Sequence, residues 1–150
     1  MQENDRTPRT TVIAVCLSEK KGTVKKPVEG AVLLEDYGIA GDAHGGTGRQ
    51  VSFLCADSVR KMEGRGVDLP PGVFAENFRL DGLRIEEVRP GQVFRVSSGP
   101  VLEVTKIGKT CHKGCEIRRI TGDCIMPREG FFAMVVKGGT VRPGDEIRIE

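Results

Sequence analysis

The densest group of reactive side chains in the sequence lies between Lys106 and Arg128. This segment contains three of the five cysteines and one of the two histidines. Between Lys106 and Arg119, five lysine and arginine side chains accompany a single carboxylate, Glu116. Positive potential favours the thiolate over the thiol, and the thiolate is the competent nucleophile and metal ligand. The segment therefore predicts at least one activated cysteine among Cys111, Cys115 and Cys124.

Cys115 has a second source of activation. Residues 115–121 predict about two helical turns that end at Gly122. A cysteine that opens a helix lies beside free N–H groups and the positive end of the helix dipole, which lower the pKa of its thiol. Two independent effects therefore point to Cys115 as a nucleophile.

Other interpretations of these thiols stay open. A structural zinc site would combine Cys111, His112 or Cys115 with Cys124 and the distant His44. The C-x3-C-x8-C spacing lacks the paired C-x2-C of ordinary structural zinc sites, so no zinc is expected. A disulfide within a redox relay and a set of inert core thiols are the other two alternatives.

The second constellation is the glycine-rich stretch from Gly41 to Gln50, GDAHGGTGRQ. Glycines allow a ligand to approach the backbone closely and let backbone N–H groups face an anion. Arg49 could clamp a phosphate with two hydrogen bonds, and Asp42 or His44 could move protons. The stretch matches neither the phosphate-loop pattern nor G-x-G-x-x-G. A flexible surface loop with a solvated histidine explains it about as well.

Short strands must position both regions. Twenty glycines and eight prolines among 150 residues, with 5% aromatic residues, indicate frequent tight turns rather than long helices. Alternating and β-rich apolar runs predict strands at residues 11–18, 28–34, 50–54, 91–97, 100–107, 131–137 and 145–149. These elements predict a mostly β fold, a barrel or a folded sheet.

Two short helices complete the expected elements. Residues 56–63 predict a helix with Asp57 as its cap, and residues 115–121 predict the other. Four lysines within residues 20–26 predict a solvated hairpin loop. We interpret Glu76 and Asn77 as an ordinary sheet edge, with a strand cap or a pocket lining as the alternative.

A short internal echo predicts a recurring turn. Residues 88–96 are VRPGQVFRV and residues 141–149 are VRPGDEIRI, identical at five of nine positions. Pro followed by Gly suits the two central positions of a type II turn, because the second position needs a positive φ. We interpret the echo as reuse of one turn-to-strand device rather than as a duplication.

Composition excludes several classes of protein. The formal net charge is +2, so a general nucleic-acid coat is not expected. No apolar run reaches the roughly 18 residues that cross a bilayer, so no membrane is expected. Residues 1–10 lack the apolar core of a secretory signal and predict a disordered tail, with reduced cysteines in a cytoplasmic protein. No G-x-S-x-G elbow marks a serine nucleophile.

Five blocks of sequence, in order, are similar to one known family. The blocks are Gly41-Asp42-Ala43-His44, residues 49–54 (RQVSFL), residues 74–78 (FAENF), Cys111-His112 with Cys115, and residues 122–130 (GDCIMPREG) with Phe132-Ala133. Together they resemble the MOSC domain, the C-terminal domain of molybdenum cofactor sulfurases, which also occurs as small free-standing proteins. The resemblance covers residues 11–150.

The resemblance implies a fold, a cofactor and site residues. It implies a single MOSC, pyruvate-kinase-barrel-like β-barrel with two or three short helices, and a pocket for the pterin-based molybdenum cofactor (molybdopterin). It implies a cysteine that carries sulfur as a persulfide or ligates molybdenum; that role falls to Cys115 or Cys124, with Cys111 as the resolving thiol. The implied cofactor-binding residues are Asp42, His44, Arg49, Gln50, Asn77, Lys109, His112 and Arg128.

The leading functional hypothesis is a sulfur carrier or cofactor-binding protein of molybdenum cofactor maturation. Pyridoxal phosphate binding is known at the level of the family, but a sulfur carrier or cofactor-binding protein needs no pyridoxal phosphate. We expect sulfur to come from a cysteine desulfurase or another donor, and to serve cofactor-biosynthesis proteins or molybdoenzymes. The alternatives are a molybdenum-dependent reductase of N-hydroxylated compounds and a non-catalytic zinc-binding module.

Overall fold

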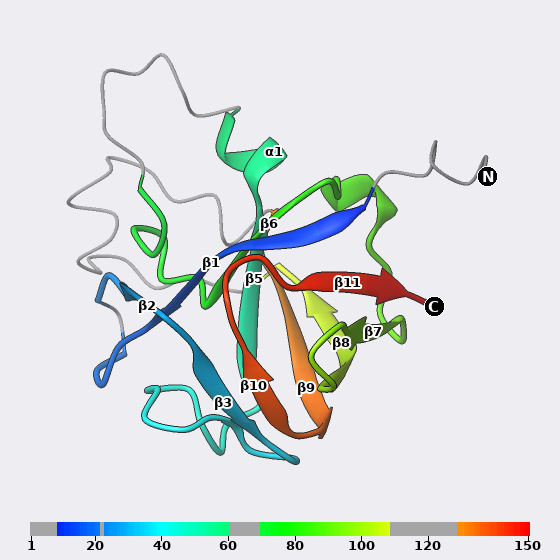
Figure 1. Ribbon diagram of the computed structural model, residues 1–150. Helices are drawn as coiled ribbons and strands as arrows, with labels where there is room; N and C mark the ends of the chain where they lie inside the picture. Colours follow the sequence, from blue (N-terminus) through cyan, green and yellow to red (C-terminus); the bar gives the residue numbers. More distant parts are fainter. Residues whose placement is uncertain (1–8, 22, 61–69, 109–128) are drawn as a thin grey trace.

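The structure is a computed structural model, and it describes residues 9–21, 23–60, 70–108 and 129–150 (Figure 1). Over these residues the chain forms strands, one short α-helix and one 3-10 helix. Their bounds are β1 (Thr10–Leu17), β2 (Lys26–Val28), β3 (Ala31–Leu34), β4 (Gly38–Ile39), β5 (Val51–Cys55), α1 (Ala56–Arg60), β6 (Phe78–Asp81), η2 (Ile85–Glu87), β7 (Val93–Val96), β8 (Val101–Ile107), β9 (Phe131–Lys137), β10 (Gly139–Val141) and β11 (Glu146–Ile149).

Seven strands close into a barrel. Their order is β11-β7-β8-β9-β5-β6-β1, and pairing of β1 with β11 completes the circle. The β5–β6 pair is parallel, and the other pairs of the barrel are antiparallel. β11 pairs with the first two residues of β1, and β2 pairs with its last three. The predicted mostly β, barrel-like fold with short helices is therefore confirmed.

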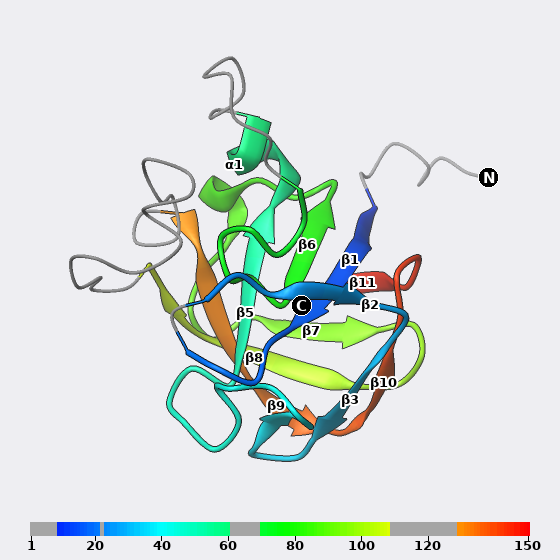
Figure 2. The same cartoon turned by 90° about the vertical axis from the view of Figure 1, so that its left-hand side faces the viewer.

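A second sheet of three strands, in the order β10-β3-β4, lies beside the barrel (Figure 2). The prediction of one strand over residues 28–34 is wrong, because residues 29 and 30 form no strand and separate β2 from β3. The prediction that residues 131–137 and 145–149 form the last two strands is also incomplete. β10 lies between them, and its first residue, Gly139, has a φ of 150° that a side chain would strain.

The barrel core contains four phenylalanine rings in mutual contact. Phe53 stacks on Phe131 with centroids 5.0 Å apart and meets Phe78 edge-on at 5.3 Å. Phe94 lies edge-on to both Phe53 and Phe131, at 5.7 and 5.9 Å. Such pairs contribute about 0.5–1.5 kcal/mol each beyond the burial of their area. These contacts join strands from across the sheet and hold the barrel wall in place.

A smaller apolar layer covers the outer face of the β5 wall. All five residues of β5 are buried, and alternate side chains point to opposite faces of a strand. Phe53 belongs to the barrel core, whereas Leu54 packs in a separate cluster with the residues before β6 and with α1. The members of this outer cluster are Leu54, Val59, Val73, Phe74, Ala75 and Phe132. Because both faces of β5 are buried, one in the barrel core and one in the outer cluster, its sequence does not alternate between apolar and polar residues.

The predicted turns and first helix are largely confirmed. Gly91 and Gly144 have φ values of 92° and 99°, as the second central residue of a type II turn requires. The two echoed strands, β7 and β11, pair with each other in antiparallel register. α1 begins at Ala56, so Asp57 lies in its first turn and is not the cap. The expected helix over 115–121 and residues 1–8 of the tail expected over 1–10 lie outside the described residues. The last residue of that expected tail, Thr10, is buried and begins β1.

Candidate functional site

A buried ion pair forms where β1 ends. Lys25 Nζ lies 2.8 Å from Asp42 Oδ1, and the two side chains are 1% and 0% exposed. The backbone N–H of Lys25 donates to Gly72 O at 2.8 Å, which fixes this part of the β1–β2 connection. The prediction of a solvated loop over residues 20–26 is therefore wrong for Lys25. The other three lysines of residues 20–26 are exposed, but Lys25 has a carboxylate from the glycine-rich stretch as its partner.

The Asp42 carboxylate accepts hydrogen bonds from three segments. Besides Lys25, Oδ1 accepts the Ser18 N–H at 3.0 Å, and Oδ2 accepts the His44 N–H at 3.1 Å. Burial by itself would raise the pKa of Asp42. The His44 side chain beside it, the hydrogen bonds from Lys25 and Ser18 and the charge of Lys25 outweigh burial, and hold that pKa well below its usual range. Asp42 is therefore a fixed anion rather than a group that exchanges protons near neutral pH.

His44 lies beside this pair and reaches the surface. Its Nδ1 is 3.4 Å from Lys25 Nζ and 3.7 Å from Asp42 Oδ2, and its side chain is 15% exposed. The glycines that follow are held by Tyr37. Gly46 donates its N–H to Tyr37 O at 2.8 Å, and a Cβ on Gly45 would lie 2.4 Å from the Tyr37 ring. The stretch is thus a turn that packs against the Tyr37 ring, and a side chain on Gly45 would push that ring aside.

The loop after β4 and the β1–β2 connection lie side by side, as Figure 2 shows. The N–H of Ala43 donates to Ser18 O at 2.7 Å. These two connections bring Lys25, Asp42 and His44 together, although Lys25 and Asp42 are 17 positions apart.

A second buried ion pair joins Glu76 and Arg79. Arg79 Nε donates to Glu76 Oε2 at 2.9 Å and Nη2 lies 2.6 Å from the same oxygen, with side chains 7% and 0% exposed. Glu76 also accepts the Phe74 N–H at 3.2 Å. Ala75 between them has a φ of 66°, a left-handed conformation that is rare for a residue with a side chain. The interpretation of Glu76 and Asn77 as a sheet edge is therefore wrong, because both are completely buried.

Asn77 ties three strands of the wall together. Its Nδ2 donates to Cys16 O at 3.0 Å, and its Oδ1 accepts the Ser52 N–H at 2.9 Å. Its own N–H donates to Ser52 oxygens, and its carbonyl accepts the Cys16 N–H at 2.6 Å. The amide is thus fixed within the barrel wall, with its hydrogen bonds directed to β1 and β5.

Arg49 and Gln50 lie at the start of β5. Gln50 bridges two segments: its Nε2 donates to Asp36 Oδ1 at 3.1 Å, and its Oε1 accepts the Val135 N–H at 3.0 Å. The Arg49 guanidinium lies over the Phe132 ring, 5.8 Å from its centroid. Arg49 is half-buried. Among the described residues no carboxylate lies within ion-pair distance of it.

The three predicted reactive cysteines, together with Lys109, His112 and Arg128, lie outside the described residues. The points where that segment leaves and rejoins the barrel are described. Gly108, after β8, donates its N–H to Gly130 O, before β9, at 2.6 Å. Two residues further on is Phe132, the ring beneath Arg49. The described residues that flank this segment therefore lie next to each other, close to the strand that carries Phe132.

The two described cysteines do not have the properties of a nucleophile. Cys16 and Cys55 are completely buried. Burial, with a smaller contribution from Glu76, raises the pKa of Cys16 to about 12. Burial, with smaller contributions from nearby carboxylates, raises the pKa of Cys55 to about 12. Both therefore remain thiols at neutral pH.

Sequence reasoning missed Lys25, Glu76 and Arg79. Lys25 stands among other lysines, so nothing local distinguishes the buried one. Glu76 and Arg79 had a usable signal, because a carboxylate and a guanidinium three apart, in a segment framed by Phe74 and Phe78, are typical of a buried pair.

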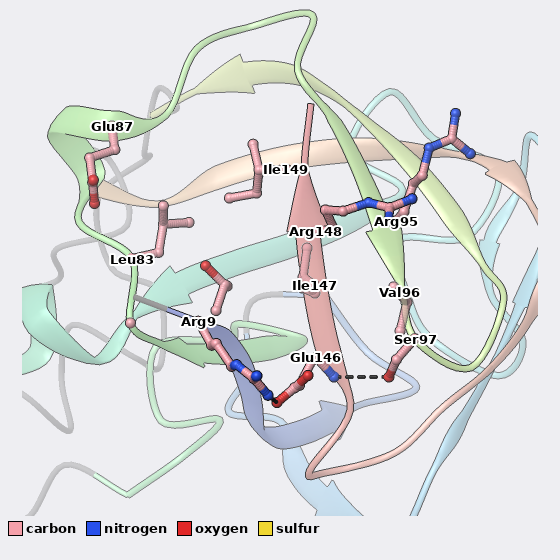
Figure 3. Close-up of a pocket in the computed structure, with 12 residues that line it drawn as sticks. Arg9, Leu83, Glu87, Arg95, Val96, Ser97, Glu146, Ile147, Arg148 and Ile149 are labelled. Carbon is pink, nitrogen blue, oxygen red and sulfur yellow. Dashed lines mark hydrogen bonds and ion pairs between the residues drawn. The ribbon is translucent and has the colours of Figure 1, made fainter. Parts of the chain in front are cut away.

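A pocket lies near the other end of β1 (Figure 3). It has a volume of about 820 Å³, and its walls combine apolar residues such as Leu83 and Ile147 with three arginines. Arg9 pairs with Glu146 at 3.2 Å, and Arg95 and Arg148 pair with Glu150 at 2.8 and 3.5 Å. These charges are exposed and neutralised, and none of the described cysteines and histidines lines the pocket. The pocket therefore does not coincide with the candidate site.

Within the described part of the chain, no three or more histidine, cysteine or acidic side chains are grouped so that they could hold a metal ion. No helix formed by the described residues has the length and apolar character that crossing a membrane requires.

The fold and site together define a small β-barrel domain with a buried ion-pair cluster on its outer wall. The MOSC domain family model matches residues 40–148. The chain therefore belongs to the MOSC domain family, whose members are associated with the molybdenum cofactor and sulfurase-like functions. No curated protein matches the sequence.

Several solved structures have a similar fold. YuaD from Bacillus subtilis superposes with a TM-score of 0.76 at 18% identity, covering 94% of this chain and 95% of that one. YiiM from Geobacillus stearothermophilus gives 0.72 at 17% identity, covering 94% and 75%. YiiM from Escherichia coli gives 0.68 at 19% identity, covering 95% and 69%. At these identities the likeness concerns the fold.

Proposed function

We propose that this MOSC domain binds the pterin-based molybdenum cofactor, or a closely related anionic ligand, beside His44 and Arg49, and carries sulfur on a cysteine of the neighbouring segment. The observation that supports the site most directly is the state of Arg49. Lys25 and Arg79 are each paired with a buried carboxylate, whereas Arg49 has no ion-pair partner among the described residues. Its charge is thus available to an anion at the surface.

The donor set suits the anionic parts of this cofactor. The cofactor carries a phosphate and dithiolene sulfurs, and a guanidinium forms charge-assisted hydrogen bonds worth about 1.5–3 kcal/mol each with such groups. His44, partly exposed at 15%, offers a further polar contact. Asp42 holds the turn that presents it. When bound, the cofactor would supply a thiophilic metal centre that a soft thiolate can ligate.

The metal-facing role belongs to cysteine, and the described thiols do not fit it. Cys16 and Cys55 are buried with pKa values raised to about 12. Cys115 or Cys124 therefore remains the proposed ligand or sulfur carrier, with Cys111 as resolving thiol. Lys109, His112 and Arg128 belong to the same proposed site by sequence alone.

The sulfur step needs only a donor persulfide. The cysteine thiolate attacks the terminal sulfur of a persulfide on a cysteine desulfurase. A new sulfur–sulfur bond forms to this chain, the donor's bond to that sulfur breaks, and the donor cysteine leaves as a thiolate. No external oxidant or reductant is consumed. Cofactor-biosynthesis proteins or molybdoenzymes would then receive the sulfur.

Peptide mass spectrometry after incubation with a cysteine desulfurase and cysteine tests this function. We expect one additional sulfur atom on Cys115 or Cys124, and none on the buried Cys16 and Cys55, which serve as internal controls. A variant that lacks both Cys115 and Cys124 should gain none. Absence of any sulfur gain on the wild-type protein would contradict the carrier function.

A further inference from the structure

The Lys25 ammonium has as many acceptors as it has protons. An ammonium carries three N–H donors and no lone pair. Nζ lies 2.8 Å from Asp42 Oδ1, 3.2 Å from Ser18 Oγ and 3.4 Å from His44 Nδ1. Because the side chain is 1% exposed, water offers little alternative. Nδ1 of the histidine is the third polar atom within reach of the ammonium, and it accepts the remaining proton only when it presents a lone pair.

The opposite arrangement, with the proton on Nδ1, is less compatible with the geometry. That proton would have to bond to Asp42 Oδ2 across 3.7 Å, a longer contact than the 3.4 Å between Nδ1 and Lys25 Nζ. Oδ2 already accepts the backbone N–H of His44 at 3.1 Å. A proton on Nδ1 would also face the ammonium protons of Lys25 at a donor–donor distance of 3.4 Å.

We propose that Lys25 is a positioning residue that holds His44 as the neutral tautomer protonated on Nε2. The Nδ1 edge of the ring faces the buried charges of Lys25 and Asp42, and the side chain is 15% exposed. None of the described residues hydrogen bonds to Nε2. Nε2 then offers a neutral N–H donor to an anionic oxygen or sulfur acceptor of the ligand. The identity of the ligand rests on the proposed function, whereas the tautomer is a property of the free protein.

Imidazole ¹H–¹⁵N correlation spectra of the ligand-free, uniformly labelled protein measure the tautomer directly. The chain has only two histidines, so a His112→Asn variant assigns the signals. At a pH where the ring is neutral, we expect at least about a tenfold excess of the Nε2–H form, the ratio that one hydrogen bond to a charged group sustains. A major Nδ1–H form in the wild-type protein would overturn the proposal.

Variants of the cluster test whether Lys25 is the cause. In Lys25→Met, the excess of the Nε2–H form should fall at least severalfold. Lys25→Met/Asp42→Asn removes both charges together, and it answers the same question if the single variant does not fold. Ser18→Ala is the matched control, because it removes another acceptor of the ammonium and leaves Nδ1 in place; its spectrum should match the wild type. An unchanged tautomer ratio without Lys25 would refute its role.

Substitutions of His44 by residues that imitate one ring nitrogen each test whether Nε2–H donates a hydrogen bond to the ligand. Glutamine places an amide N–H near Nε2, and asparagine places one near Nδ1. With molybdopterin cofactor released from a denatured molybdoenzyme as the probe, His44→Gln should retain affinity within a few fold, and His44→Asn should lose about tenfold. Equal losses in both variants would contradict the Nε2 donor. A wild-type protein with the Nε2–H tautomer that binds no cofactor would refute the proposed function and leave the tautomer standing.

Discussion

At the carboxyl end of β1, Lys25 and Asp42 pair at 2.8 Å with side chains 1% and 0% exposed, whereas near its amino end Arg9 and Glu146 pair at 3.2 Å with side chains 74% and 48% exposed. The two regions use the same kinds of charge. In the first, each group has several fixed partners and no water to replace them. In the second, which surrounds the pocket of Figure 3, water competes for every contact.

Because of this difference in burial, the first ion pair can hold the side chains around it in place, and the second cannot. A buried ion pair gives little net stability over apolar packing, but removal of one partner leaves a costly unpaired charge. Such a cluster therefore fixes the orientation of its neighbours, here His44 and the glycine turn. Exposed pairs are worth about 0–1 kcal/mol and fix little. A large pocket volume is therefore a weaker guide to function in this molecule than the buried network.

The largest expected effect comes from the removal of Lys25. Lys25→Met should lower the free energy of unfolding by about 3–5 kcal/mol, because Asp42 is left buried without its counter-ion. Arg95→Met at the pocket should change it by about 1 kcal/mol or less, because its pair with Glu150 is exposed. Urea unfolding of both variants measures the comparison. Equal losses would show that the two regions do not differ as described.

A smaller effect is expected from the backbone beneath the cluster. Gly72 has a φ of 89°, and a Cβ there would lie 2.0 Å from Lys25 O. Gly72→Ala should cost about 2–3 kcal/mol, since it combines left-handed strain with a clash against the backbone. Gly91→Ala has a similar φ, 92°, but open space around the Cβ, so it should cost about 1–2 kcal/mol. Thermal unfolding compares the two, and a larger loss in Gly91→Ala would contradict the packing described for Lys25.

The smallest effect concerns the dependence of stability on pH. The pKa of Asp42 is depressed in the folded protein, so its contribution is fully present above the unfolded value of about 4 and is lost as the pH falls through the depressed pKa. Asp42→Asn should therefore flatten the acid limb of the stability profile by up to about 1.4 kcal/mol per pH unit. Asp57→Asn, on the partly exposed surface of α1, is the control. An acid limb of unchanged slope in Asp42→Asn would contradict the assignment of the pair.

Local sequence signals predicted most of the barrel. Alternating apolar runs marked the long strands, and the Pro-Gly pairs before β7 and β11 marked turns whose glycines do adopt positive φ. β10 was missed because it has only three residues, Gly139–Val141, and is defined by pairing with β3. A strand so short carries no periodicity of its own.

The candidate site was predicted only in part, for the same reason. The glycine stretch identified Asp42, His44 and Arg49 because their residue types and their glycine neighbours form a local pattern. Lys25 is recognised as part of the site only when two connections meet in space, and no local pattern records that contact. The burial of Glu76 likewise depends on Arg79 and on the outer apolar cluster, which are tertiary features.

Molybdenum cofactor retention tests the central claim most directly. Wild type, Arg49→Ala and Arg95→Ala would be purified from cells that make the cofactor, and molybdenum and pterin would be measured per chain. We expect retention by the wild type and by Arg95→Ala, and a loss of at least about tenfold in Arg49→Ala, because a charge-assisted contact of more than about 1.4 kcal/mol is removed. Retention by Arg49→Ala together with loss in Arg95→Ala would place the ligand at the other end of β1 and contradict the account.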